Sequence, residues 1–374
     1  MNKQQEPTGR TPPPGAMPTS PPAAKSVAGP TQAKGVGFDP SLDLPLIRRP
    51  EGQPTFGENH AFWFFDEAGR YYINTHIQSL EAYWPIRQET ISICLPDGRI
   101  LVDMTEGWNT TADTVGGAYL RARCVEPFRL WRVECAGTFV ETTQQALADG
   151  PLSSERRRLV DWDADIVCPA PPYLTGGGDA TNPGAATANR FMGGMRYEQL
   201  FRADVRLRVH GEPETRFTAT GDRTHRQGPR NVSGFAGHDW KACLFADGTG
   251  FNTHRYRTPD DGEAWSEAFV MRDGRVIPAE IVEDTWITSR RLQGETLRVR
   301  LASELGETFI EGETLGGTFR AMNAQPDNPY GRLFGVHTGV PGSLALSQSW
   351  ARYRMDGNTA NGLLERSILT DRLR

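Results

Sequence analysis

Residues 195–210 read MRYEQLFRADVRLRVH, and their alternating pattern indicates the fold class. From Phe201 to Val209 every second residue is apolar, whereas the residues between them, from Arg202 to His210, are charged or histidine. A period of two puts these sets on opposite faces of a β-strand, while a helix would scatter both sets around its axis. We therefore predict one long strand here, with one face on a core and the other in water or against a polar partner.

The sequence around this strand repeats the same pattern in shorter form. From Phe38 onward, apolar runs are separated by Gly, Asp and Asn at intervals of about 8–12 residues, which is typical of an antiparallel sandwich or barrel. Further alternation predicts strands over 296–302 and 344–353, and helices are expected only near 142–149 and 361–369. Hairpins with type I′ turns are expected at three Asp-Gly pairs, which tolerate positive φ angles, and a related turn at Ala68-Gly69; the pairs are 97–98, 247–248 and 273–274.

A Pro- and Gly-rich segment, PAPPYLTGGGDATNPGAATAN at 169–189, divides the body of the chain. The first 36 residues contain eight prolines and no Phe, Leu, Ile, Tyr or Trp, so they cannot bury a core. We predict a disordered tail over 1–36, a β domain over 37–175, a linker or crossover over 176–189 and a second β domain over 190–374. Closed sheets are favoured because closure removes exposed edges.

Composition excludes several classes of function. The 374 residues carry 41 Lys+Arg against 46 Asp+Glu, a net charge of -5, so nucleic acid is not an expected partner. No apolar run is long enough to predict a membrane span, and no secretory signal is expected. The five cysteines contain no C-x-x-C pair, which indicates buried thiols in a reducing, cytoplasmic setting rather than disulfides or structural zinc; they are Cys94, Cys124, Cys135, Cys168 and Cys243.

The chemistry concentrates in 221–240, GDRTHRQGPRNVSGFAGHDW. On an extended chain Arg223, His225 and Gln227 share one face, and the residues between them, which include Asp222, share the other. On the next strand His238 and Trp240 share a side, with Asp239 opposite. An imidazole beside guanidinium groups in an apolar cavity is suited to proton transfer, because both surroundings favour its neutral form.

Two other interpretations of the same residues stay open. Arginines 223 or 230 paired with aspartates 222 or 239 could fasten the sheet, with the histidines hydrogen-bonded at its seams. Alternatively, His225, His238 and His254 could bind a metal ion, although their spacing matches no recognised motif. We expect no metal site and no cofactor.

These residues resemble a known family. Arg196-Tyr197-Glu198-Gln199, a long strand, the run from Gly221 to Arg230 and then His238-Asp239-Trp240 resemble the second-domain signature of tandem lipocalin-like proteins related to hydroxyneurosporene synthase (carotenoid 1,2-hydratase) and AttH. Residues 57–64, GENHAFWF, resemble the opening of the first domain. The sequence departs from the family pattern where Thr224, Gln227 and Asn231 replace two acids and an aromatic residue.

The resemblance implies an all-β protein of two lipocalin-like antiparallel barrels packed together, with an apolar ligand site in or between them. It implies a cofactor-independent hydratase, lyase or isomerase acting on a hydrophobic terpenoid, steroid or polyketide-like molecule. The alternative is a carrier that only binds such a ligand. The sequence does not indicate the oligomeric state.

Roles can be assigned in this scheme. We expect His225 to act as general acid or base, Arg223 and Arg230 to orient it or stabilise negative charge, and Asp222 or Asp239 to hold its tautomer. His238 completes the expected catalytic set. Alternation places Glu198 outside its own barrel and exposed, unless a bulge or the other domain covers it. The expected ligand-binding residues are Tyr197, Glu198, Gln227, Trp240, Trp63 and Trp84.

Overall fold

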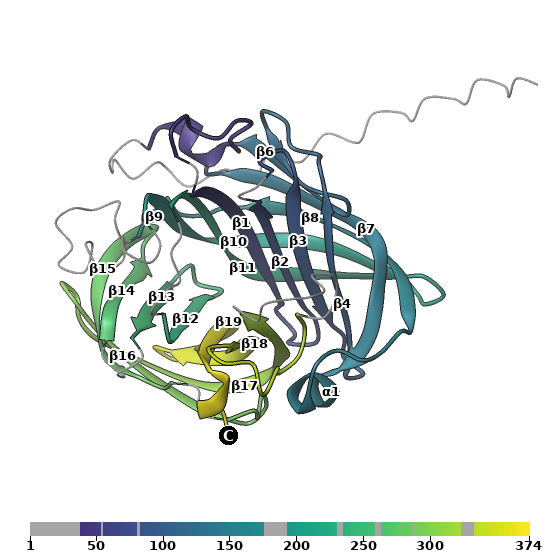
Figure 1. Cartoon of the computed structure of the whole chain (residues 1–374). Coiled ribbons are helices and arrows are strands. Elements are labelled where there is room, and N and C mark those ends of the chain that lie inside the picture. Colours follow the sequence, from purple (N-terminus) through teal and green to yellow (C-terminus); the bar gives the residue numbers. More distant parts are fainter. Residues whose placement is uncertain are drawn as a thin grey trace, which may run out of the picture. The chain divides into compact units, whose positions relative to one another are not determined.

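The computed structural model describes residues 38–53, 55–80, 83–175, 193–229, 235–258, 263–286, 289–322 and 333–374. The tail expected over 1–36 and the linker expected over 176–189 lie outside these residues. The described chain is almost entirely β-structure, with strands running through both halves (Figure 1). The all-β prediction is therefore confirmed.

The first of two sheets has eleven strands. Eight of them run in the order β4-β3-β2-β1-β11-β10-β8-β7, and pairing of β4 with β7 closes these eight into a ring, called here the first barrel. Short strands β5, β6 and β9 flank it. The bounds are β1 Phe56–Asp66, β2 Tyr72–Ser79, β3 Arg87–Cys94, β4 Arg99–Gly107, β5 Thr114–Val115, β6 Leu120–Glu126, β7 Leu130–Thr143, β8 Arg157–Val167, β9 Tyr173–Leu174, β10 Met195–Val209 and β11 Thr215–Pro229.

The second sheet is a closed barrel of eight strands, β12 to β19, each paired with its neighbour in sequence. Pairing of β12 with β19 completes the ring. We call it the second barrel. Its strands are β12 Gly237–Leu244, β13 Gly250–Arg257, β14 Glu263–Arg272, β15 Arg275–Asp284, β16 Thr296–Ser303, β17 Gly306–Met322, β18 Leu344–Met355 and β19 Asn358–Leu369.

Strand β10 is the long strand predicted from its alternation, and its place in the sheets differs from the expected division. Strands β10 and β11 pair with each other, β10 also pairs with β8, and β11 with β1. They therefore complete the first barrel, although they follow the Gly/Pro-rich segment. The change of sheet falls after Pro229 and before Gly237, so the expected boundary at residue 190 does not coincide with it.

Local predictions succeed unevenly. Helix α1 (Gln144–Asp149) forms where expected, capped by the Thr143 hydroxyl, which accepts a hydrogen bond from the Ala146 N–H. The helix expected over 361–369 is wrong, because these residues form β19 and pair with β18 and β12. Two short 3-10 helices, η1 (Pro40–Asp43) and η3 (Thr370–Arg372), are also present.

All three Asp-Gly hairpins exist, but only one has the expected turn. Asp273 and Gly274 both have positive φ, 49° and 69°, as a type I′ turn requires. At Gly98 and Gly248 only the glycine is left-handed, and each glycine N–H donates to the carbonyl three residues before it. These two loops are therefore longer than a two-residue hairpin, and their aspartates keep ordinary φ values.

Alternation along the strands divides the apolar side chains among three large clusters. On β1, Phe62 and Phe64 point into the first barrel, whereas Trp63 belongs to a cluster that joins the two sheets. On β12, Trp240 enters that joining cluster, and Cys243 enters the core of the second barrel. Strand β11 also lies against β12 and β19 of the second barrel, so both of its faces are covered. All five cysteines are buried thiols, as expected. Among the described residues, no helix has the length and apolar character needed to span a membrane.

Candidate functional site

The polar residues of β11 fall into two groups on opposite faces of the strand. Arg223, His225 and Gln227 point into the first barrel, where they join a set called here the inner cluster. Thr224 and Arg226 face the second barrel and line a pocket between the two sheets, the interbarrel pocket. The alternation expected on this segment is thus confirmed, and it separates residues that the sequence scheme combined in one site. The inner cluster consists of Asp43, Glu58, His60, Arg87, Tyr197, Gln199, Arg223, His225 and Gln227.

Arg223 anchors one end of the inner cluster. Its guanidinium donates to both carboxylate oxygens of Asp43, at 2.7 and 3.2 Å, and to the Tyr197 hydroxyl at 2.9 Å. It also donates to the Gln199 amide oxygen at 3.0 Å and lies over the ring of Trp131. Burial alone would raise the pKa of Asp43, but the Arg223 charge and these hydrogen bonds outweigh burial and hold the pKa below its usual value. Helix η1 is thereby fastened to the barrel.

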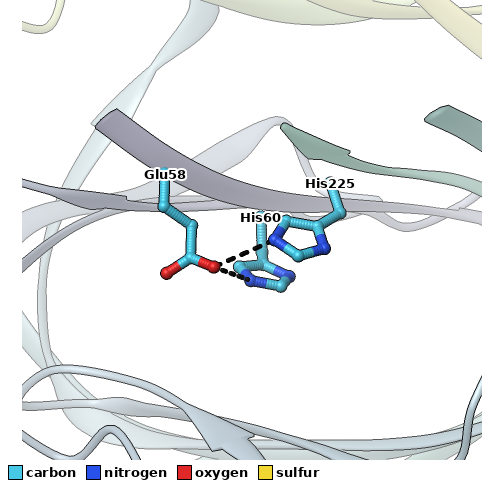
Figure 2. A group of neighbouring side chains, drawn as sticks. All are labelled: Glu58, His60 and His225. Atoms are coloured by element: carbon cyan, nitrogen blue, oxygen red, sulfur yellow. Dashed lines mark hydrogen bonds and ion pairs between the residues drawn. The ribbon is translucent and has the colours of Figure 1, made fainter. Parts of the chain in front are cut away.

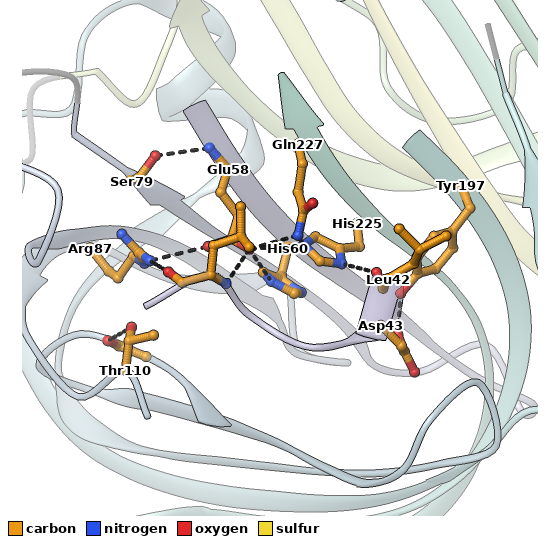
Figure 3. A network of polar contacts seen from close by, with 12 residues as sticks. Leu42, Asp43, Glu58, His60, Ser79, Arg87, Thr110, Tyr197, His225 and Gln227 are labelled. Carbon is orange, nitrogen blue, oxygen red and sulfur yellow. Dashed lines mark hydrogen bonds and ion pairs between the residues drawn. The ribbon is translucent and has the colours of Figure 1, made fainter. Parts of the chain in front are cut away.

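His225 and Glu58 form the other end (Figures 2 and 3). The His225 Nε2 atom lies 3.0 Å from Glu58 Oε1, and its Nδ1 lies 2.9 Å from the Leu42 carbonyl oxygen. His60 stacks on His225, with ring centroids 3.7 Å apart and an interplanar angle of 20°. Arg87 donates to Glu58 Oε2 at 3.1 Å. All four side chains are buried.

Electrostatics inside the first barrel keep Glu58 ionised and His60 neutral. Burial opposes ionisation of Glu58, but contact with His225 and His60 holds its pKa well below the usual value. Burial and the neighbouring His225 lower the pKa of His60 to about 4.

The interbarrel pocket has a different character. Its walls combine aromatic rings with imidazole, guanidinium and carboxylate groups. It is narrow, with a cavity volume of about 60 Å³, which is enough for a few water molecules. Its lining consists of Asn59, Trp63, His76, Arg196, Thr224, Arg226, His238, Trp240, His254, Tyr256, Arg320, Met322, Leu346, Gln348 and Glu365.

A His–Glu pair lies in this pocket. His238 Nε2 is 3.0 Å from Glu365 Oε1, and its Nδ1 is 2.7 Å from the Ser367 hydroxyl. Gln348 donates to the second oxygen of Glu365 at 3.0 Å. Burial would raise the pKa of Glu365, but the hydrogen bond and charge of His238 reverse this and lower the pKa. A carboxylate therefore orients this imidazole, in the manner of a catalytic His–acid pair.

A cation and a second imidazole lie beside that pair. Arg196 donates to Glu198 Oε1 at 2.6 Å and to the Tyr256 hydroxyl at 2.9 Å, and its guanidinium lies 4.5 Å from the centroid of the Trp240 ring. His254 stacks on Trp240 with centroids 5.0 Å apart. Its Nδ1 has no hydrogen-bond partner among the residues described.

Burial shifts the titration of this face strongly. Burial, followed by the charges of Arg196 and His238, lowers the pKa of His254 well below its usual value, so this imidazole is neutral. Burial raises the pKa of Asp222 to about 7 and raises that of Glu198 well above its usual range, against the opposing charge of Arg196. The pocket thus contains a neutral base and lies beside carboxyl groups that hold protons unusually tightly, a pattern that clusters at functional sites.

Several expected site residues occupy other places. Asp239 points into the second barrel, where it contacts Lys241, which also contacts Asp284 at 2.6 Å. It cannot orient His225 or His238, because strand alternation turns it to the opposite side of β12. Asp222 is held by the Asn252 amide at 3.2 Å rather than by an imidazole. The group that orients His225 is Glu58. Arg230 lies outside the described residues.

The expected ligand-binding residues are divided in the same way. Trp63 and Trp240 line the pocket, with ring centroids 4.7 Å apart in an edge-to-face contact. Glu198 lies on the same face of β10 as Arg196, toward the second barrel, and it is buried, so the second barrel does cover it. Tyr197 and Gln227 belong to the inner cluster instead. Trp84 lies outside the pocket and donates its indole N–H to the Leu46 carbonyl at 3.2 Å.

The three-histidine alternative is wrong for the same geometric reason. His238 and His254 share the interbarrel pocket, with ring centroids 6.4 Å apart. His225 points to the other side of β11 and contacts Glu58 and His60.

Sequence reasoning missed several residues of both groups. Glu58 and His60 stand two apart in a stretch quoted only for its family resemblance, and their alternation could have placed them on one face with Phe62. Glu365 was hidden by the helix expected over 361–369. Asp43 and Arg87 carry no local signal, because only the closed barrel brings them to β11.

Comparison with known families places the chain. Residues 47–369 match the model of a family described as "Domain of unknown function (DUF7064)". The chain belongs to this family. Among curated proteins, none matches this DUF7064 member.

Solved structures resemble the chain in fold. An AttH-like protein of Nitrosomonas europaea has 13% identity and a TM-score of 0.55, covering 91% of this chain and 99% of its own. CghA in complex with Sch210972 has 12% identity and a TM-score of 0.49, covering 85% and 89%. Kievitone hydratase from Nectria haematococca has 11% identity and a TM-score of 0.43, covering 84% and 88%. The AttH-like structure confirms the predicted resemblance for the fold of this DUF7064 member.

Proposed function

We propose that the protein binds a small, largely apolar molecule in the interbarrel pocket and catalyses proton transfer on it, as a hydratase-, lyase- or isomerase-type enzyme. One observation carries this proposal: the oriented His238–Glu365 pair, the neutral His254 and the cation Arg196 meet in one pocket walled by tryptophans. Terpenoid, steroid and polyketide-like molecules are the substrate classes that the family resemblance suggests.

The proposed roles follow from these contacts. His238 takes up a proton from the substrate or from water, and Glu365 stabilises the imidazolium that forms. Arg196 stabilises negative charge that develops on a substrate oxygen. The ring faces of Trp63 and Trp240 hold the apolar part of the molecule. Each role uses a group already held in place by its neighbours.

The carboxylate of Glu365 takes the place, in the pocket, of an acid that the family pattern has and this chain lacks. Thr224 lines the pocket where the family pattern has an acid, which leaves β11 without that proton donor. Glu365 supplies a carboxylate to the same pocket from β19, on the opposite barrel. This replacement supports acid–base chemistry in the pocket by a different set of residues.

The narrow pocket sets a condition on binding. Drug-sized ligands occupy pockets of roughly 300–1,000 Å³, so a ligand of that size requires the walls to separate. Met322, on β17, is the flexible apolar residue of the lining, and its unbranched side chain can adopt other rotamers. We expect it to move when a ligand binds.

A binding protein without catalysis is the second candidate, and one observation favours it. Both ring nitrogens of His238 already have partners, Glu365 and Ser367, so proton transfer to a substrate requires one hydrogen bond to break. Ligand carriage requires no such change.

Native mass spectrometry of the purified full-length protein tests the proposal and identifies any ligand that copurifies. The ligand is then incubated with wild type, with His238→Ala and with His210→Ala, whose imidazole is exposed and distant from the pocket. We expect turnover to fall by roughly 100-fold or more in His238→Ala and to be unchanged in His210→Ala. An unchanged ligand after long incubation with wild type would favour carriage.

A pocket-filling variant tests the location independently of turnover. Met322→Trp should abolish binding of the ligand found, whereas Leu305→Trp, at an exposed position of the second barrel, should leave binding unchanged. Equal affinities of both variants for the ligand would show that it binds elsewhere.

A further inference from the structure

We propose that Glu58, His60 and His225, inside the first barrel, form a binding site for one divalent transition-metal ion, with Zn²⁺ as the best-fitting ion. The three side chains each offer one ligand atom, and these atoms lie within 4.8 Å of one another (Figure 2). The site lies on the opposite face of β11 from the interbarrel pocket, so it is independent of the function proposed above.

Two of the three separations between ligand atoms, both involving Glu58, lie near the edge length of a metal tetrahedron. With zinc–ligand distances near 2.0–2.2 Å, tetrahedral geometry places neighbouring ligand atoms about 3.3 Å apart. Glu58 Oε1 lies 3.0 Å from His225 Nε2 and 3.7 Å from His60 Nε2, one value on each side of that figure. Two imidazoles and one carboxylate are also a ligand set that Zn²⁺ and Fe²⁺ commonly use.

His225 is already oriented as a metal ligand. Its Nδ1 lies 2.9 Å from the Leu42 carbonyl oxygen, which can only accept, so this nitrogen carries a hydrogen. In the neutral ring the Nε2 lone pair then faces Glu58 Oε1, and the only donor beside both atoms among the described residues is the Gln227 amide nitrogen, 3.3 Å from each. A metal ion at this place would bind both lone pairs directly. A second nitrogen donating to a backbone carbonyl is the usual outer-shell arrangement of a metal-bound histidine.

His60 supplies the second, independent observation. Its side chain is 1% exposed, and neither ring nitrogen has a hydrogen-bond partner among the residues described. A buried polar group without a partner is costly. A metal ion bound through Nε2 would satisfy that nitrogen of the imidazole, which points toward Glu58 (Figure 2).

Gln227 can complete the coordination. Its terminal amide nitrogen lies 3.3 Å from both Glu58 Oε1 and His225 Nε2, again close to a tetrahedral edge. Rotation of the amide by half a turn exchanges nitrogen and oxygen and presents a carbonyl oxygen at the same place. Metal binding would also require the two stacked imidazoles to move apart and to turn, because both rings must radiate from one ion.

The competing occupant is a proton. An imidazolium at His225 would also satisfy Glu58 Oε1, and it would leave both ring nitrogens of His60 without a hydrogen bond, with Nε2 at 3.7 Å from Glu58 Oε1. The full-length protein, stripped with a chelator and dialysed against Zn²⁺ or Co²⁺, separates the two. We expect about one tightly held ion per chain by elemental analysis, a higher melting temperature with Zn²⁺, and the visible absorption of tetrahedral Co²⁺. A wild-type protein that keeps no ion and shows no Co²⁺ bands would overturn the proposal.

Variants assign the ion to these residues. His60→Asn should weaken Zn²⁺ binding by more than the roughly 10–100-fold effect of losing an outer-shell partner, and Gln227→Ala should weaken it less. The matched control is His210→Asn, an exposed histidine of the same first barrel. Zn²⁺ affinity unchanged in a folded His60→Asn protein would contradict the proposed ligand set, and the wild-type measurements decide the question if this variant does not fold.

Discussion

The two faces of β11 show how neighbouring residues of one strand are used differently. On the first-barrel face, Arg223 has partners for its guanidinium on three side chains, and its site is closed by helix η1. On the other face, Asp222 and Thr224 lie beside a pocket where one imidazole nitrogen has no partner among the described residues and carboxyl pKa values are raised. The Arg223 end of the inner cluster is thus satisfied, unlike its His60 end and unlike the interbarrel pocket. Satisfied buried networks stabilise a fold, whereas incomplete ones are found where ligands bind. Three consecutive residues can test this contrast.

Arg223→Ala should have the largest effect on stability. It leaves Asp43 as a buried charge without its cation, so we expect the free energy of unfolding to fall by about 3–5 kcal/mol in urea titrations. Arg208→Ala removes a half-exposed arginine of β10 that pairs with Asp161, and its cost should be below about 1 kcal/mol. Similar losses in both variants would show that the inner cluster is not a special source of stability.

Asp222→Asn should change the pH dependence of stability. The folded-state pKa of Asp222 is raised to about 7, so its contribution is fully present below the unfolded value near 3.8 and is lost as pH rises toward 7. Over this pH window the free energy of unfolding of the variant should rise relative to that of wild type, by at most about 4 kcal/mol. Above pH 7 the difference should stay constant.

Asp97→Asn is the control of opposite sign. A hydrogen bond from Arg99 lowers the pKa of Asp97, so wild type should be slightly more stable than this variant above pH 4 and lose that advantage in acid. Unfolding curves recorded from pH 3 to 8 would measure both differences. Parallel pH profiles for Asp222→Asn and wild type would mean that Asp222 does not titrate as described.

Thr224→Val should have the smallest effect of the three. The Thr224 hydroxyl donates to the Tyr197 carbonyl at 3.0 Å, and its loss should cost about 1 kcal/mol, measured by urea unfolding. Thr218→Val, at an exposed position of the same strand, should cost less. A Thr224→Val loss as large as that of Arg223→Ala would remove the distinction between the two faces.

Much of the fold follows from local sequence patterns. The alternation over 195–210 predicted β10, and the alternation over 221–240 correctly assigned His225 and His238 each to a face of its own strand. The pattern failed at 361–369, because residues buried by pairing with two neighbours give no helix or strand period by themselves. The site was predicted only in part. Its residue types were found, but they were combined into one cluster.

Local sequence patterns were enough to predict the β-structure, the approximate strand positions and the face on which each polar residue of β11 lies, because a period of two is a local property of an extended chain. What each face contacts depends on the packing of distant strands. Strands β10 and β11 join the first barrel, η1 brings Asp43 and Leu42 to one face, and the second barrel brings Glu365 and His254 to the other. These partners lie far away in the chain, and closure of the barrels, which no local pattern records, sets their positions.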